Sequence, residues 1–204
     1  NSFLKSNVSV VDLSDKRITL IISNPSSDGV EDWSPDSKEI LFTTNGNDTT
    51  SNFYTNSKLF AINLSTKVIR QLAKDLDEDL GGFSWEASGI YSSVWNKTKR
   101  QLHRIDPATG NHAVLLTTPE QIYGFSFSKN GARVAFVGRN SDQLNEVFVT
   151  DIASMQLVKI TDMTDQTVGW KTAQSEVISW RSKDGATIEG VLHKPADYDP
   201  SVKY

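Results

Sequence analysis

The residues whose spacing could most readily do chemistry are acidic. Asp75, Asp77, Asp79 and Glu86 occupy positions 1, 3, 5 and 12 of one window, as the oxygen ligands of a calcium-binding loop do. Such a loop needs glycine at position 6, where this chain has Leu80, and helices on both sides, where this chain has no helical periodicity. We therefore expect a solvated acidic linker here rather than a metal site.

The remaining reactive residue types form no catalytic pattern. His103, His112 and His193 lie far apart without the spacing of metal ligands, which predicts surface or hairpin histidines. The chain has no cysteine, which excludes disulfides, thiolate metal sites and cysteine nucleophiles. No G-x-S-x-G nucleophile elbow occurs; the nearest stretch, residues 124–128, lacks the second glycine and falls on a predicted strand. The sequence thus predicts no catalytic, cofactor-binding or metal-binding residues and no cofactor.

The element that recurs along the chain is a strand–turn–strand unit. In residues 33–42 (WSPDSKEILF), Pro35 presets the backbone of a turn, and a strand rich in β-branched and aromatic residues follows. Residues 125–136 repeat this unit with Asn130-Gly131 in the turn, and residues 83–91 are a looser copy. The aromatic residues at the turns are 52 and 42 residues apart, at Trp33, Trp85 and Phe127.

A second marker repeats out of phase with the first. An apolar strand ends at Asp or Asn, a short turn follows, and another strand begins. These markers are 51, 43 and 45 residues apart, at Asp12, Asn63, Asp106 and Asp151. Each repeat therefore holds four antiparallel strands joined as two hairpins, and four strands in about 40–50 residues are typical of a β-propeller blade.

We therefore predict an all-β fold, a partial β-propeller of about three and a half four-stranded antiparallel blades. The predicted blades cover residues 1–22 in part, 30–74, 80–118 and 122–162, and Gln166–Trp170 could open a further inner strand. A closed propeller needs typically four to eight blades, so the sequence predicts an arc with open strand edges. On such strands large aromatic side chains commonly pack between blades. We expect this role, rather than substrate stacking, for Trp33, Trp85, Trp95, Trp170 and Trp180.

Composition excludes several classes of function. The 204 residues carry a formal charge of -4 with scattered charges, so the basic stripe that nucleic acid requires is absent. No stretch approaches about 18 apolar residues, so no membrane span is expected, and the first residues lack the features of a signal peptide. This composition leaves both a cytoplasmic and a periplasmic or secreted location open.

The C-terminal segment departs from the blade pattern. Two predicted strands surround a tight turn at Lys183-Asp184-Gly185, and a polar, proline-bounded exit follows. The runs 178–185 (ISWRSKDG) and 188–192 (IEGVL), followed by Lys194-Pro195, resemble the crossing from propeller to catalytic domain in the prolyl oligopeptidase family. The likeness is greatest to its acylaminoacyl-peptidase and dipeptidyl-peptidase-like branches. The Trp33-Ser34-Pro35-Asp36 repeat is similar to the propellers of those enzymes and of TolB-like proteins.

This resemblance implies a division of the chain and a role. Residues 1–172 would be a propeller fragment, and 173–204 a connecting hairpin and linker toward an α/β-hydrolase domain that the chain lacks. Members of the family cut short peptides with a Ser-Asp-His triad on that domain, while the propeller restricts access. This chain alone is then expected to have no peptidase activity, and its role in a parent serine-type peptidase would be to gate and select peptide substrates. In the family, side chains that line the channel can hold the free or blocked N-terminus of the substrate, and three residues are candidates by position for this role: Arg139, Glu31 and Asp32.

Two other interpretations remain open. The chain could be a TolB-like β-propeller protein-interaction module without an enzymatic partner domain, although the hairpin at residues 176–193 favours the peptidase because a pure binding propeller does not need it. It could also self-associate through its open propeller edge. The expected partners are thus a peptide substrate through the parent enzyme, the missing α/β-hydrolase domain, or a second copy.

Overall fold

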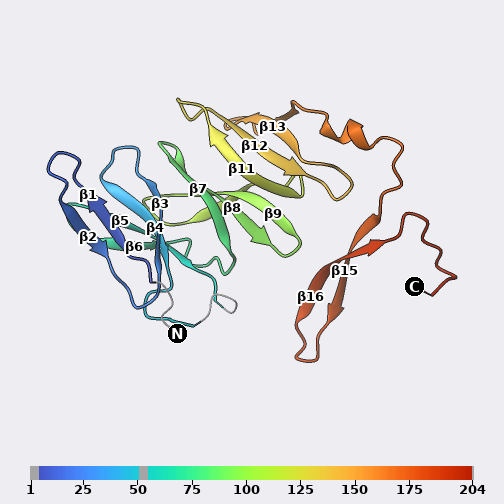
Figure 1. Ribbon diagram of the computed structural model, residues 1–204, viewed down its shortest axis with the longest axis horizontal. Coiled ribbons are helices and arrows are strands. Elements are labelled where there is room, and N and C mark those ends of the chain that lie inside the picture. The colour runs from blue at the N-terminus through green and yellow to red at the C-terminus, as the bar shows by residue number, and fades with distance from the viewer. Residues whose placement is uncertain (1–4, 51–54, 204) are drawn as a thin grey trace. The chain divides into compact units, whose positions relative to one another are not determined.

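The computed structural model describes residues 5–50 and 55–203 (Figure 1). In this part of the chain the regular structure is β-strand throughout, apart from one short 3-10 helix, η1 (Met163–Thr167). The all-β class predicted from the repeated strand–turn–strand units is therefore confirmed. None of the helical structure in the described residues is long and apolar enough to cross a membrane.

The chain divides into two compact units. The first comprises the residues up to Val94 together with His103–Val114, and the second comprises Trp95–Leu102 and the residues from Leu115 onward. Two strands, β8 (Gly89–Asn96) and β9 (Lys99–Ile105), contribute residues to both units. The boundary that the sequence suggests between residues 172 and 173 stays a prediction.

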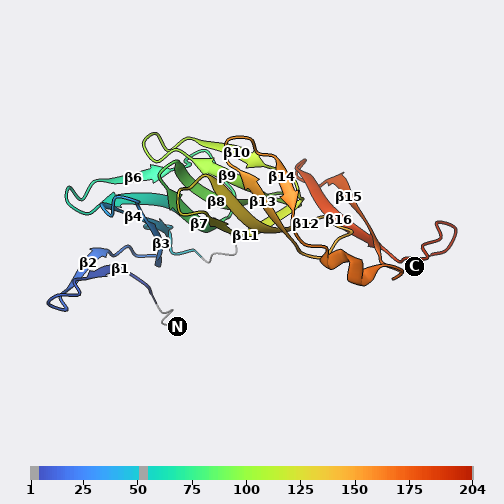
Figure 2. The ribbon, with the colours of Figure 1, turned by 90° about the horizontal axis from the view of Figure 1, so that it is seen from above.

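Sequential strands pair into blades. A half-blade consists of β1 (Val8–Val11) and β2 (Ile18–Ile22). The first complete blade, β3-β4-β5-β6, has its strands at Asp28–Trp33, Glu39–Thr44, Lys58–Asn63 and Ile69–Leu72. The second adds β7 (Leu80–Glu86) and β10 (His112–Leu116) to β8 and β9. The third is paired in the order β11-β12-β13-β14, at Gln121–Phe127, Arg133–Arg139, Glu146–Asp151 and Leu157–Lys159, and Figure 2 labels all four strands. A parallel bridge between β11 and β9 joins it to the second blade in one eight-stranded sheet. The half-blade and the three complete blades are the predicted set of three and a half blades.

The core of the first unit lies on both faces of β4. Because side chains alternate along a strand, Leu41 faces one way and Ile40 and Phe42 face the other. Leu41 packs in a buried cluster with Ala61 and residues of the second blade. The opposite face contacts the half-blade through a second buried cluster that includes Val8. Burial on two faces explains the continuous apolar run in β4, and each such side chain contributes roughly 1.5–3 kcal/mol.

The repeated turn is held by a serine hydroxyl. Ser34 Oγ accepts a hydrogen bond from the backbone N–H of Glu39 at 2.9 Å and donates to the Asp36 carboxylate at 2.8 Å. In the third blade, Ser128 Oγ accepts from the backbone N–H of Arg133 at 3.0 Å. These bonds satisfy backbone donors inside the turn, which is why serine suits this position.

The first strand of every complete blade carries a β-bulge. The bulges are register shifts at Val30–Asp32, Gly81–Phe83 and Tyr123–Ser126. A bulge re-aims the side chains beside it. In β3 the carboxylate of Asp32 accepts a hydrogen bond from the backbone N–H of Trp85 at 2.7 Å, which joins the first blade to the second.

The prediction of a further inner strand at Gln166–Trp170 is wrong. Gln166 belongs to η1, and Trp170 follows in a loop, 70% exposed. The buried carboxylate of Glu146 on β13 explains the helical turn, because it accepts the backbone N–H groups of Met163 at 3.0 Å and Thr164 at 2.8 Å. The Thr161 hydroxyl, together with these bonds, lowers the pKa of Glu146 to about 2.

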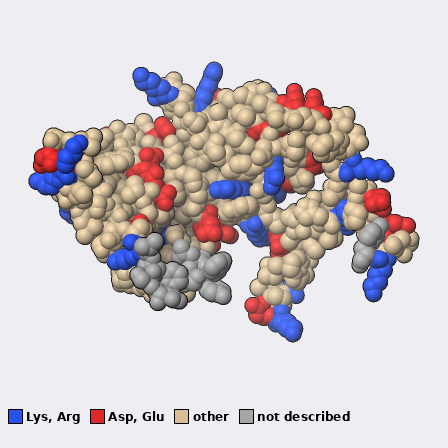
Figure 3. Space-filling view, in the orientation of Figure 1, with Lys and Arg blue, Asp and Glu red and all other residues tan. Residues whose placement is uncertain are grey.

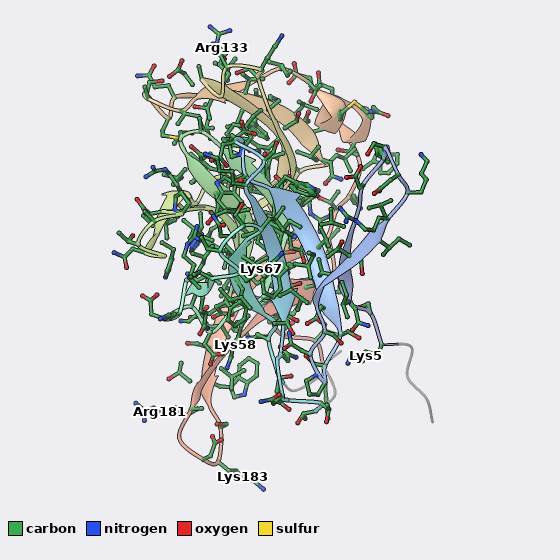
Figure 4. All side chains as sticks on the ribbon, turned by 90° about the vertical axis from the view of Figure 1, so that its left-hand side faces the viewer. Lys5, Lys58, Lys67, Arg133, Arg181 and Lys183 are labelled. Atoms are coloured by element: carbon green, nitrogen blue, oxygen red, sulfur yellow. The ribbon has the colours of Figure 1, made fainter. Side chains whose placement is uncertain are left out.

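After the third blade, β15 (Gln174–Arg181) and β16 (Thr187–Lys194) form a two-stranded hairpin. Figure 4 shows Arg181 and Lys183 near its tip, with side chains pointing away from the rest of the chain. An ion pair of 2.5 Å between Lys97 and Glu189 ties the hairpin to the turn between β8 and β9 within the second unit. The hairpin predicted from the sequence is present and one or two residues longer at its open end.

Candidate functional site

A cleft of about 310 Å³ opens in the second unit, between the open end of the β15–β16 hairpin and the edge of the third blade. Its blade side consists of the β8–β9 turn, the start of β11 and the end of β12, and its other side of both hairpin strands. Figure 3 shows a hollow beside the hairpin, with Lys and Arg side chains next to it. We call this the hairpin cleft, and its principal residues are Lys99, Glu120, Arg139, Val177, Val191 and His193.

Hydrogen bonds fix the blade side of the hairpin cleft. The backbone N–H of Glu120 donates to the side-chain oxygen of Asn140 at 3.2 Å, and the backbone N–H of Ser141 donates to the Glu120 carboxylate at 3.1 Å. The Asn140 amide in turn donates to Gln143 at 3.0 Å. The side chain of Gln121 donates to the backbone oxygen of Thr98 at 3.2 Å, so the β8–β9 turn and β11 are held together.

The acidic side chains of the cleft have partners, whereas two of its basic side chains have none in the described part of the chain. Glu176 forms an ion pair with Lys194 at 2.8 Å, and Glu120 is engaged by the backbone of Ser141. Lys99 and Arg139 line the same cleft, and within residues 5–50 and 55–203 neither side chain forms a hydrogen bond or an ion pair. Two cations therefore remain available for an anionic ligand, which distinguishes this cleft chemically from a neutral groove.

A serine and a histidine meet at the hairpin side of the cleft. Ser175 Oγ and His193 Nδ1 are 2.7 Å apart across the β15–β16 ladder. A catalytic nucleophile and base need a third group that orients the base, and His193 makes no further hydrogen bond within the described residues. Both side chains line the hairpin cleft, where their polar atoms can contact a bound ligand.

A larger, shallower hollow of about 780 Å³ adjoins the hairpin cleft and shares Glu120, Asn140 and Ser175 with it. Part of its wall is the segment Trp170–Ser175, which follows η1 and includes the first two residues of β15. Trp170 thus has a place beside the cleft that its sequence position alone did not indicate.

The three residues suggested for the channel separate in the structure. Arg139 is the last residue of β12 and lines the hairpin cleft. Glu31 and Asp32 lie on β3 in the first unit, as predicted, but both carboxylates accept hydrogen bonds from other residues of that unit. The Thr43 hydroxyl donates to Glu31 at 2.7 Å, and burial raises the pKa of Glu31 despite this bond. Asp32 accepts from the backbone of Trp85.

The prediction of surface or hairpin histidines is confirmed as to the hairpin, because His103 and His112 lie on the paired strands β9 and β10. His103 is not a surface residue, however. This residue is 3% exposed, and its Nδ1 lies 3.3 Å from Nδ1 of His112. Nε2 of His112 is in turn 3.6 Å from the Asp75 carboxylate. Burial, and then the neighbouring His112, lower the pKa of His103 to about 4. β9 and β10 are adjacent antiparallel strands, and pairing brings together two histidines that are nine residues apart.

The acidic stretch lies in the loop between β6 and β7, where Asp75, Asp77 and Asp79 are all exposed. No helix flanks it, and Glu86 ends β7 with its carboxylate accepting the Ser84 hydroxyl at 2.7 Å. Within the described residues, no three His, Asp or Glu side chains come together as a group that could hold a metal ion.

The tryptophans do not share one role. All five lie in the described part of the chain, and Trp85 alone is buried, at 8% exposed, between the first and second blades. The packing role predicted for the other four is wrong: the exposed ones are Trp33, Trp95, Trp170 and Trp180.

Sequence reasoning missed most of the hairpin cleft. Lys99, Glu120 and Val177 stand at strand starts or in a hairpin and match no motif. The repeat itself contains a signal for the cleft. When the blades are aligned, equivalent strand ends lie at the same side, and these ends include the β8–β9 turn, the start of β11 and the end of β12.

Comparison with known proteins places the fold. No protein-family model and no curated protein matches the sequence. Among solved structures, TolB from Acinetobacter baumannii is 20% identical with a TM-score of 0.57, over 92% of this chain and 46% of TolB. Acylaminoacyl peptidase from Pyrococcus horikoshii is 14% identical with a TM-score of 0.69, over 93% of this chain and 28% of the peptidase.

A third solved structure is also similar over nearly the whole of this chain at low sequence identity. Dipeptidyl peptidase 4 from Porphyromonas gingivalis is 14% identical with a TM-score of 0.70, over 96% of this chain and 28% of the enzyme. The chain spans less than half the length of each of these structures. At these identities the similarity concerns the fold: the chain has the β-propeller architecture found in TolB and in peptidases of the prolyl oligopeptidase family.

Proposed function

We propose that this chain is a propeller module that gates and selects peptide substrates for a serine peptidase of the prolyl oligopeptidase family. The observation that carries the proposal is the β15–β16 hairpin, whose apolar residues are exposed on both faces of the ribbon. Val177 is 52% exposed and Trp180 on the opposite face is 48% exposed. A two-stranded hairpin is marginally stable in water unless something packs on it.

The hairpin is therefore suited to carry another domain on its apolar residues. Val177 and Val191 pair directly on one face, whereas Trp180 pairs with Ile188 on the other. A domain seated there would lie next to the hairpin cleft, because Val177 and Val191 also line the cleft. In this proposal, the blade and the hairpin limit which peptides reach that domain.

The test uses the product of the complete reading frame that encodes this chain. A fluorophosphonate probe, which labels activated serine nucleophiles, should label that product. It should cleave short chromogenic peptides much faster than the same sequence placed within a long unfolded protein, because the propeller excludes long chains. Absence of labelling, or equal cleavage of short and long substrates, would contradict the gating role.

A TolB-like interaction module remains the second candidate, since the fold of TolB matches 92% of this chain. The same labelling experiment separates the two. A full-length product that carries no reactive serine and binds no peptidase substrate is the outcome expected for an interaction module.

A further inference from the structure

We propose that the hairpin cleft binds a small carboxylate carrying an aliphatic group, and that the free C-terminal end of a peptide is its natural example. Arg139 and Lys99 would bind the carboxylate, and Val177 and Val191 would contact the aliphatic group. This inference does not depend on a peptidase activity, because it concerns binding to the chain itself.

The charge of the cleft selects an anion. Arg139 ends β12 and Lys99 begins β9, and neither has a side-chain partner among the described residues. The two acids of the cleft are engaged, Glu176 with Lys194 at 2.8 Å and Glu120 with the Ser141 backbone at 3.1 Å. A guanidinium offers two parallel N–H donors that match a carboxylate, so Arg139 supplies geometry as well as charge.

The apolar side of the cleft selects an aliphatic group. Val177 and Val191 are directly opposite each other in the β15–β16 ladder, so their side chains stand side by side on one face. They are 52% and 45% exposed, which leaves apolar surface for a ligand to cover. A volume of about 310 Å³ is at the lower end for small-molecule pockets, which suits one or two amino-acid residues rather than a long chain.

The cleft is held open by contacts that the ligand does not need to break. The Lys97–Glu189 ion pair of 2.5 Å fixes the hairpin to the β8–β9 turn, and the side chain of Asn140 is bonded at both its oxygen and its nitrogen. Preorganisation of this kind lowers the cost of ordering on binding.

The experiment is a titration of the 15N-labelled chain followed by amide chemical shifts. The three probes are N-acetyl-leucine, its C-terminal amide, and 4-methylpentanoate, which keeps the side chain and the carboxylate but lacks the peptide group. We expect N-acetyl-leucine to bind with a dissociation constant on the order of millimolar and to shift the amides of Lys99, Arg139, Val177 and Val191. The amide analogue should bind at least about threefold more weakly, since its charge is gone.

The probes also distinguish two sources of the ligand. Tighter binding of N-acetyl-leucine than of 4-methylpentanoate supports a peptide C-terminus, and equal binding supports a free aliphatic acid. Equal binding of the acid and its amide, or shifts confined to residues outside the cleft, would overturn the proposal.

Two variants and a matched control complete the test. Arg139→Gln and Lys99→Gln should each weaken the binding of N-acetyl-leucine by about threefold to tenfold. Each substitution removes one solvent-exposed charge that would pair with the carboxylate of the ligand. Lys183→Gln removes the same charge from the tip of the hairpin, where Figure 4 shows its side chain in solvent, and should leave binding unchanged. If all three variants bind as the unaltered chain does, the assignment of the two cations is wrong.

Discussion

The first blade and the β15–β16 hairpin are built from the same kind of strand and treat their apolar residues in opposite ways. Leu41 on β4 is 0% exposed, whereas Val177 on β15 is 52% exposed. Both lie in antiparallel ladders of regular register. The difference is burial: β4 packs into a buried apolar cluster on each face, whereas none of the described residues of β15 and β16 is buried.

This comparison shows that strand formation and strand stability are separate properties. Apolar residues of strand-forming types are present in both ladders, but only the blade buries them. The hairpin is an element whose stability depends on what covers it, and the largest effects of mutation should therefore fall in the blade.

The largest expected contrast is between core truncations in the two regions. Leu41→Ala removes a fully buried side chain and should lower the free energy of unfolding by about 2–5 kcal/mol. Val177→Ala removes a half-exposed one and should cost less than about 0.5 kcal/mol. Urea unfolding of both variants measures the difference, and equal losses would mean that the hairpin is covered in solution.

A second contrast concerns pH. Burial and the neighbouring His112 lower the pKa of His103 from 6.5 to about 4, so between these values the unfolded chain binds a proton that the folded chain does not. The contribution of His103 to the free energy of unfolding is therefore fully present above pH 6.5. It decreases as the pH falls toward 4, by less than about 1.4 kcal/mol per pH unit. His103→Phe should flatten this slope, whereas the hairpin variant His193→Gln should keep it. Thermal melts across this pH range measure the slope of melting temperature against pH. If that slope is unchanged in His103→Phe, a group other than His103 is responsible.

The turns of the two regions offer a smaller contrast. The Ser34 hydroxyl is buried and accepts the backbone N–H of Glu39, so Ser34→Ala should cost about 1 kcal/mol. The Ser182 hydroxyl bonds Asp184 in the hairpin turn, and because that turn is in solvent Ser182→Ala should cost a few tenths of a kcal/mol. Urea midpoints of the two variants decide this, and a larger loss for Ser182→Ala would reverse the ranking.

The smallest expected effect is that of calcium on the acidic loop. Asp75, Asp77 and Asp79 are exposed and no helix flanks them, so millimolar calcium should leave the melting temperature unchanged. A rise in melting temperature that Asp77→Ala abolishes would restore the calcium site.

Sequence patterns predicted the blades well because the signals were local. The turn residues and the strand-ending Asp and Asn residues depend on neighbours within a few residues, and the strand–turn–strand units predicted at residues 33–42 and 125–136 are both present. The wrong strand at Gln166–Trp170 failed for a non-local reason. The carboxylate that holds η1 belongs to Glu146, about 20 residues earlier on another strand.

The site residues were harder to predict for the same reason. Arg139 could be proposed from its place at a strand end, but its companions in the hairpin cleft come from several separate segments. The histidine pair became visible only through the pairing of β9 with β10, because spacing rules for metal ligands do not describe cross-strand neighbours. Exposure of four tryptophans likewise depends on which faces are covered, and local sequence does not encode that.

The bulge in β3 has a consequence for cooperativity. Glu31 is the extra residue of that bulge, and deleting it would restore the regular pleat and re-aim the carboxylate of Asp32. The bond from the Trp85 backbone would then be lost, and with it a direct link between consecutive blades. The bulge residue thus makes the unfolding of the first and second blades more cooperative. Its deletion should broaden the unfolding transition more than it lowers the midpoint.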